Sequence, residues 1–162
     1  MQEHLSAQSN PQQSQPLASR WQRLGGALLD GLLLSLIEVP ALIVTGCFEG
    51  IVEGRELPTR SLLLSVLIHQ IAFLAVNGWL LVHRGQTVGK KLLGTRIVGL
   101  DGGLRPFGSL YLMRYLAPQA ISNAPVVGAV FALVDALFVF REDHRCLHDL
   151  LAGTKVVKEG AS

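Results

Sequence analysis

Two long apolar runs and one interrupted apolar stretch dominate the chain of 162 residues. The runs at 24–46 and 61–82 each reach the roughly 20 residues that a helix needs to cross a hydrocarbon core about 30 Å thick. The third stretch, 107–140, is too long for one crossing and contains Pro118 and Pro125. It fits either two short crossings, at 107–121 and 125–140, or one interfacial helix followed by one crossing.

The composition favours a membrane protein. Hydrophobic residues are 49% of the chain and charged residues only 16%, which is typical of a polytopic membrane protein. Residues 1–19 are rich in Gln, Ser and Pro and contain no apolar segment of the signal-peptide kind, so we expect a disordered tail there. Residues 20–158 then form the transmembrane domain, and 159–162 a short second tail.

The distribution of positive charge predicts the orientation. Cations gather in 83–108 and after residue 140, whereas the loop 49–60 holds three Glu and two Arg. By the positive-inside rule both cation-rich segments face the cytoplasm, so the number of crossings is even. We therefore expect an all-α membrane protein, a bundle of four transmembrane helices with cytoplasmic N- and C-termini. Three crossings plus an interfacial helix is the alternative.

The chain repeats a short pattern after the second run and after the last. Segment 92–98, Leu-Leu-Gly-Thr-Arg-Ile-Val, lines up with 150–157 when a gap is allowed. Each copy predicts a helix exit, a turn and a short β-strand. We expect the two strands to pair as a small cytoplasmic β element, with Asp101–Gly103 closing a hairpin. Chance similarity between two membrane exits is the alternative.

Polar residues interrupt the apolar runs at similar depths. At 1.5 Å per residue, Asp30, Asn77, Arg114 and Asp135 lie about 8 to 10 Å from the cytoplasmic ends of their helices, which predicts one polar layer. An ionised side chain in hydrocarbon costs on the order of 3 kcal/mol unless it is paired or hydrated. We therefore expect Arg114 to pair with Asp30 or Asp135. Arg23 lies almost two turns before Asp30 on the same helix face.

A second polar layer is expected nearer the outer face. Glu38 and His69 each fall about 12 Å from the outer ends of their helices, so they can touch. Such a pair titrates as a coupled unit in low dielectric, which is one way to carry a proton. Pro40 removes a backbone hydrogen bond close to Glu38. The alternative is that these buried charges only fix helix packing.

Three blocks of sequence stand out when they are taken together. They are R-x6-D formed by Arg23 and Asp30, G-Q-T-V-G-K-K-L-L-G at 85–94, and L-H-D-L-L-A-G-T-K-V-V at 147–157. In this order they resemble the RDD family of bacterial integral membrane proteins. The family is named for one Arg and two Asp, which map onto Arg23, Asp30 and either Asp135 or Asp149. The resemblance implies a bacterial inner (plasma) membrane location and, for some members, cation/proton antiport.

Two functions follow from these patterns. The first is proton-coupled transport of a small cation, and the second is a non-catalytic membrane subunit or scaffold whose buried charges specify packing. The candidates for the ion or proton pathway are Asp30, Asp135, Glu38, His69 and Asn77, and those for structural ion pairs are Arg23, Arg114 and Asp149.

Other chemistry is not expected from the sequence: no enzyme activity, no cofactor and no metal site. The cluster of His144, Cys146, His148 and Asp149 has no second ligand group elsewhere, so we favour a basic turn with Asp149 capping the last helix. Cys47 and Cys146 fall on opposite membrane sides and should not form a disulfide.

The expected partners are membrane lipid, through the basic residues near anionic headgroups, and a second copy of the chain or another membrane protein. The small residues at 25–27 or 129–132 are the expected helix contact. Nucleic acid is excluded because the basic residues are not interleaved with aromatics and the net charge is only +2.

Overall fold

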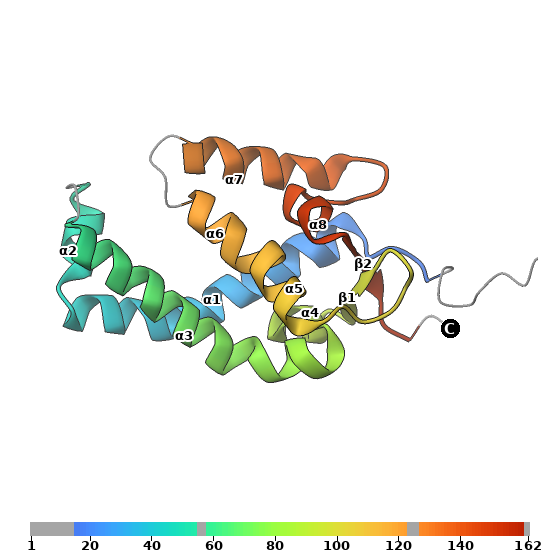
Figure 1. Ribbon diagram of the computed structural model, residues 1–162, viewed down its shortest axis with the longest axis horizontal. Helices are drawn as coiled ribbons and strands as arrows, with labels where there is room; N and C mark the ends of the chain where they lie inside the picture. Colours follow the sequence, from blue (N-terminus) through green and yellow to red (C-terminus); the bar gives the residue numbers. More distant parts are fainter. Residues whose placement is uncertain (1–14, 55–57, 123–126, 161–162) are drawn as a thin grey trace, which may run out of the picture. The chain divides into compact units, whose positions relative to one another are not determined.

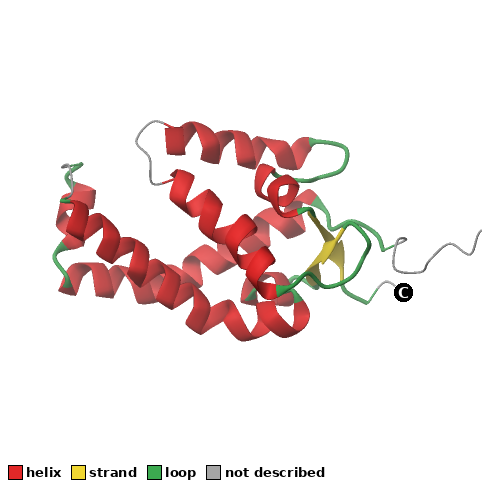
Figure 2. Cartoon of the chain, viewed as in Figure 1, coloured by secondary structure: helices red, strands yellow, loops and turns green. Residues whose placement is uncertain are grey.

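The computed structural model describes residues 15–54, 58–122 and 127–160 (Figure 1). These residues form two compact units. The first unit is Trp21–Leu93, and the second joins the described residues up to Arg20 to those from Gly94 onward. Most of the described chain is helical, with one pair of short strands (Figure 2).

The first unit contains α1 (Arg20–Val44), α2 (Cys47–Val52), α3 (Thr59–Arg84) and α4 (Val88–Leu92). The apolar runs therefore become α1 and α3, within a few residues of the expected bounds. Helix α3 ends at Gly85, whose left-handed backbone (φ 63°) lets its N–H reach the carbonyls of Leu80 and Leu81. This glycine stop turns the chain directly into α4.

Helices α1 and α3 are long and apolar enough to cross a membrane, and they are exposed where a soluble core helix would be covered. In the most apolar stretch of each, only 6% of the α1 residues and 28% of the α3 residues are buried. Large side chains such as Leu28, Leu36 and Leu63 are more than half exposed. Because apolar faces of this size favour lipid over water, the exposure indicates a membrane environment.

The second unit contains a helix in three parts, α5 (Phe107–Tyr111), η2 (Leu112–Leu116) and α6 (Ala117–Ser122). The middle part is a π-helix. A π-helix is wider than an α-helix, and Pro118 accounts for it here. Proline has no N–H for the carbonyl of Arg114, and its ring would clash with that carbonyl in an α-helix. The helix thus continues past Pro118 and places Arg114 in the widened turn.

The remaining helices of the second unit are α7 (Val127–Leu137), η3 (Phe138–Phe140) and α8 (Leu147–Ala152). The apolar helix Val127–Phe140 is shorter than the 18 residues that α1 and α3 exceed. The described structure therefore has two helices of crossing length, and four crossings remain a prediction.

Strands β1 (Thr95–Gly99) and β2 (Thr154–Lys158) pair antiparallel, as the repeat predicts. Ile97 lies opposite Val156, and both are almost completely buried. The expected hairpin at Asp101–Gly103 is wrong. Those residues form a turn in which the Gly99 N–H donates to the Gly103 carbonyl at 2.8 Å, but the next element of the described chain is the helix α5 (Phe107–Tyr111) and not a strand.

A third segment lies along β2. The Ala18 N–H donates to the Val156 carbonyl and the Lys158 N–H to the Pro16 carbonyl, each at 3.0 Å, with a bridge from Leu17 to Val157. The expected disordered tail 1–19 is therefore wrong at these positions, because the free edge of β2 offers backbone partners there. Residues 1–14 lie outside the described residues.

Candidate functional site

The short helix α4 is held at its N-terminus by side chains from α1, from α3 and from the turn just before it. Its first N–H groups have no partners within the helix. The Val88 N–H donates to Asn77 Oδ1 of α3 at 2.9 Å, and the Gly89 N–H donates to Asp30 Oδ1 of α1 at 2.7 Å. The hydroxyl of Thr87, the residue just before the helix, accepts from the Lys90 N–H at 3.4 Å. We call this arrangement the α4 cap.

Asp30 is the centre of the α4 cap. Its second oxygen accepts a hydrogen bond from the Thr87 hydroxyl at 2.5 Å and lies 3.7 Å from Lys90 Nζ. The side chains of Lys90 and Asp30 are only 11% and 12% exposed. A hydroxyl, a backbone amide and an ammonium group thus surround the carboxylate, and hydrogen bonds to an ionised acceptor are the strong kind. Its partners come from α4 and the turn before it.

Glycines allow α4 to approach α1 closely enough to form this cap. A Cβ on Gly89 would collide with the Gly26 carbonyl oxygen, whereas a Cβ on Gly26 would lie at an ordinary contact distance, 3.6 Å, from the Gly89 backbone. A Cβ on Gly25 would meet Leu93 at 3.0 Å. Gly25 and Gly26 therefore face Leu93 and Gly89 of the same chain. Of the two predicted contacts between copies, the one at Ala129 and Ala132, both exposed, then stays a prediction.

Helix α8 begins with a related arrangement. Asp135 Oδ1 of α7 accepts from the His148 N–H at 3.0 Å, and Asp135 Oδ2 lies 2.7 Å from His148 Nδ1. Asp149 Oδ2 accepts from the backbone N–H of Cys146, the residue before the helix, at 3.2 Å. The prediction that Asp149 caps the last helix is confirmed. We call this arrangement the α8 cap.

A buried ion pair supports the α8 cap. Arg114 Nη1 contacts Asp149 Oδ1, with the two side chains 2% and 0% exposed. The same nitrogen donates to the Thr154 hydroxyl at 2.8 Å, and that hydroxyl donates to Asp149 Oδ1 at 3.3 Å. The expectation that Arg114 pairs with Asp30 or Asp135 is wrong, because α8 brings Asp149 directly to the arginine.

The two caps occupy equivalent places in the repeat. With no gap, Thr87 corresponds to Cys146, Gly89 to His148 and Lys90 to Asp149. The glycines that end the two short helices both have left-handed backbones, with φ 62° at Gly94 and φ 60° at Gly153. The paired Ile97 and Val156 are also equivalent. The repeat is therefore structural, and the gap in the sequence alignment is unnecessary.

The predicted polar layer is divided between the units. Asp30 and Asn77 meet at α4, whereas Arg114 belongs to the group around α8 with Asp135. The depths of polar residues along the apolar runs did not predict Thr87, Lys90 and Thr154, which complete the two caps. Thr87 can be recognised from the sequence as a capping residue, since threonine is a common N-cap just before a helix. Arg23 is 7% exposed on α1, and its predicted ion pair stays a prediction.

The expected contact between Glu38 and His69 is present. His69 Nδ1 of α3 lies 2.8 Å from Glu38 Oε1 of α1, with the two side chains 28% and 20% exposed. The imidazole also stacks on Phe73, with ring centroids 6.5 Å apart. Pro40 lies within α1, half a turn beyond Glu38. The two helices of crossing length thus share one acid–base pair away from α4.

Comparison with known proteins identifies the family. A model of the RDD family matches residues 17–153. The chain belongs to the RDD family. It is also 33% identical over 139 residues to the uncharacterized protein YckC of Bacillus subtilis (strain 168), covering 86% of this chain and 83% of that protein. No solved structure matches the chain. Membership of the RDD family and two exposed apolar helices together indicate a membrane protein.

Proposed function

We propose that this RDD protein moves a small cation across the bacterial inner membrane in exchange for a proton, with Glu38 and His69 as the proton-carrying pair. The observation that carries the proposal is the 2.8 Å approach of His69 Nδ1 to Glu38 Oε1 between α1 and α3. A carboxylate and an imidazole in contact form a donor and acceptor between which a proton can be passed. Intramembrane ionisable pairs of this kind are typical of proton relays.

The surroundings of the pair also supply oxygen atoms for a cation. Pro40 has no N–H, so the carbonyl of Leu36 lacks the donor that a helix normally provides four residues later. Leu36 and Glu38 are two residues apart and lie on opposite sides of a straight helix, so the proposal includes a bend of α1 at Pro40 that brings this carbonyl toward the carboxylate. Carbonyl and carboxylate oxygens are the ligands that hard cations prefer. Protonation of the pair would then weaken cation binding and couple the two movements.

We assign the other predicted pathway residues to structure. Asp30, Asn77 and Asp135 each accept a backbone N–H of a short helix, so their oxygens already have partners. Removing such an acceptor leaves a backbone donor unsatisfied, which damages folding before it affects transport. The proposal therefore rests on Glu38 and His69.

The proposal includes four crossings with both termini cytoplasmic, supported by the cations of 83–108 and of the segment after residue 140. Single cysteines at Pro58 and Ser162 test it by labelling from either side of the membrane. Cys47 and Cys146 are both free thiols and are replaced by serine in these variants, so that only the introduced cysteine can be labelled. Labelling of Pro58→Cys from outside and of Ser162→Cys only from inside is expected. Labelling of both from outside would contradict it.

Transport itself is tested in proteoliposomes that contain a pH-sensitive dye. An imposed sodium or potassium gradient should drive proton movement with the wild-type protein and not with Glu38→Gln or His69→Asn. His83→Asn is the matched control, since His83 lies on the same helix and its Nδ1 is 2.9 Å from the Trp79 carbonyl. Full activity in Glu38→Gln and His69→Asn would exclude this pair as the proton carrier.

A second candidate function is a non-catalytic membrane subunit. The observation that favours it is that Asp30, Asp135 and Asp149 all cap short helices. Buried charges in membrane bundles often specify packing. Folded wild-type protein that moves no protons under any sodium, potassium or lithium gradient would favour this function over transport.

A further inference from the structure

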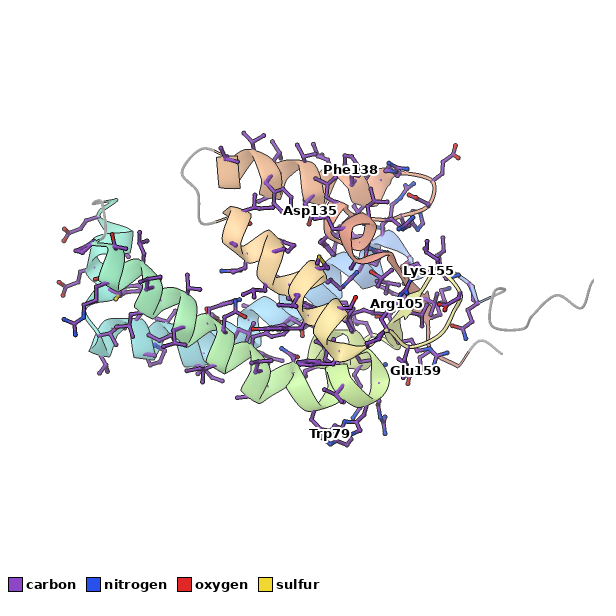
Figure 3. All side chains as sticks on the ribbon, viewed as in Figure 1. Trp79, Arg105, Asp135, Phe138, Lys155 and Glu159 are labelled. Atoms are coloured by element: carbon purple, nitrogen blue, oxygen red, sulfur yellow. The ribbon has the colours of Figure 1, made fainter. Side chains whose placement is uncertain are left out.

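The start of α8 gathers three side chains that bind transition metals. They are Asp135 from α7, Cys146 just before α8 and His148 in its first turn, and their ligand atoms lie within 4.8 Å of one another. The sequence alone left the Cys and His without a ligand from another part of the chain. The fold supplies that ligand, because the side chain of Asp135 points toward α8 (Figure 3).

We propose that Asp135, Cys146 and His148 bind a divalent ion of the zinc class, with a fourth position open to water. A thiolate, an imidazole and a carboxylate together select borderline-soft ions over sodium, magnesium or calcium. Three protein ligands plus one open position is a common zinc arrangement.

The observed spacing needs only small adjustments to fit such an ion. Bonds of about 2.0 to 2.3 Å at tetrahedral angles place the ligand atoms roughly 3.3 to 3.6 Å apart. Asp135 Oδ2 and His148 Nδ1 are 2.7 Å apart, and no pair exceeds 4.8 Å. Shifts of about 1 Å through side-chain rotation therefore close the site.

The backbone around the site already orients the carboxylate. Asp135 Oδ1 accepts the His148 N–H, which leaves Oδ2 directed at the imidazole. A metal ion would take the place of the contact between Oδ2 and the ring, while the N–H continues to fix the carboxylate. Hydrogen bonds of this kind to metal ligands raise affinity. The side chains of His148 and Asp135 are 24% and 20% exposed, so an ion can reach them.

The α4 cap shows that a short helix in this fold is capped without these metal ligands. At the places of Cys146 and His148 it has Thr87 and Gly89, and Asp30 accepts the Gly89 N–H just as Asp135 accepts the His148 N–H. The Cys146 sulfur forms a capping box with Asp149, in the place that the Thr87 hydroxyl has at α4, so the capping role itself requires neither sulfur nor imidazole. A thiol and an imidazole in these places add metal-binding chemistry to an equivalent backbone.

Cobalt(II) is the probe for the first experiment, with the full-length protein in detergent and without a histidine tag. One Co²⁺ per chain should bind with the near-ultraviolet charge-transfer band of a cobalt–thiolate bond, and Zn²⁺ should displace it. Cys146→Thr, which copies Thr87, should remove the band, whereas Cys47→Ser should keep it. His148→Asn and Asp135→Asn should weaken binding by more than about tenfold, a loss that even supporting residues around metal ligands produce.

Two results would overturn the proposal. One is wild-type protein without a thiolate band at saturating Co²⁺, and the other is a band that survives in Cys146→Thr. X-ray absorption of the zinc-loaded wild type gives an answer that needs no variant. We expect one sulfur at about 2.3 Å from the zinc, and a shell of only nitrogen and oxygen would contradict the site.

Discussion

The two short helices α4 and α8 have equivalent backbones, and each is held by one ion pair. The acid and the base of that pair change places between the two copies. In the α4 cap the long helix α1 supplies the acid, Asp30, and the short helix supplies the base, Lys90. In the α8 cap the helix α5–η2–α6 supplies the base, Arg114, and the short helix supplies the acid, Asp149. Lys90 and Asp149 occupy equivalent positions in the repeat. Each copy therefore keeps one ion pair between a long and a short helix.

The pairs differ in burial and in the separation of their charges. Asp149 is fully buried, whereas the side chains of Asp30 and Lys90 are 12% and 11% exposed and their charged atoms lie 3.7 Å apart. Each carboxylate also accepts one hydroxyl and one backbone N–H, Asp30 from Thr87 and Gly89 and Asp149 from Thr154 and Cys146. Equivalent pairs in a repeat can thus carry different shares of the stability, because their burial differs while their other hydrogen bonds match.

The largest effect is expected from removing Arg114. Arg114→Met leaves the buried carboxylate of Asp149 without its cation, and breaking a buried pair in this way costs about 3–5 kcal/mol. The free energy of unfolding in detergent should fall by that amount. The double variant Arg114→Met with Asp149→Asn should recover part of the loss, because no buried charge is then left unpaired.

Lys90→Met is the matched control for Arg114→Met. The Lys90 and Asp30 side chains are partly exposed and their charged atoms lie 3.7 Å apart, so we expect a loss of only about 1 kcal/mol. Equal losses in the two variants would show that burial does not distinguish the pairs.

The next effect is expected at Gly89. In Gly89→Ala the new Cβ collides with the Gly26 carbonyl oxygen, and crowding of this kind costs about 1–3 kcal/mol. Thermal unfolding of the purified protein measures the loss. Gly31→Ala on α1 is the control, because nothing lies within 4 Å of its Cβ and alanine favours a helix over glycine by about 1 kcal/mol. A Gly89→Ala protein as stable as wild type would contradict the close contact of α1 with α4.

The sequence predicts the helices and strands well, because their signals are local. The apolar runs mark α1 and α3, and the repeat marks β1 and β2 and the pairing between them. The contact of Glu38 with His69 follows from depth alone, since both helices are long and regular. The pairing of Pro16–Ala18 with β2 has no pattern of its own and depends on a strand edge formed by distant residues.

The partners of Asp30 and Arg114 were not predicted, for a physical reason. The depths along the helices predict only which polar side chains can meet each other, whereas Asp30 accepts the backbone N–H of Gly89. Any residue except proline has such a group, so side-chain type does not reveal it. Gly26 and Asp30 lie one turn apart on the same face of α1, and this is the face that Gly89 approaches.

Replacing each capping Asp by Asn should have a moderate effect and tests whether the caps are equivalent. In both Asp30→Asn and Asp135→Asn, one oxygen still accepts the backbone N–H while the charge is lost. Hydrogen bonds with an ionised partner exceed neutral ones by about 1 kcal/mol, so both variants should lose about that much stability. Denaturant unfolding of the two variants measures it. A loss of stability in only one of the two variants would show that the caps have the same geometry but contribute unequally to the free energy of unfolding.

The smallest effect is expected in the segment before α8, which has no counterpart before α4. Burial raises the pKa of Asp143, but the Arg145 N–H and the Arg141 guanidinium outweigh it and hold the pKa below its ordinary value. A lowered pKa means that this carboxylate stabilises the fold at neutral pH and stops doing so as the pH falls through the folded-state pKa. Because the Arg141 and Asp143 side chains are 50% and 37% exposed, Asp143→Ala should cost less than about 0.5 kcal/mol at pH 7. Unfolding of both proteins at neutral and strongly acidic pH should show this small difference disappear in acid. A large or pH-independent loss would mean that the segment, and not only the cap, holds α8 in place.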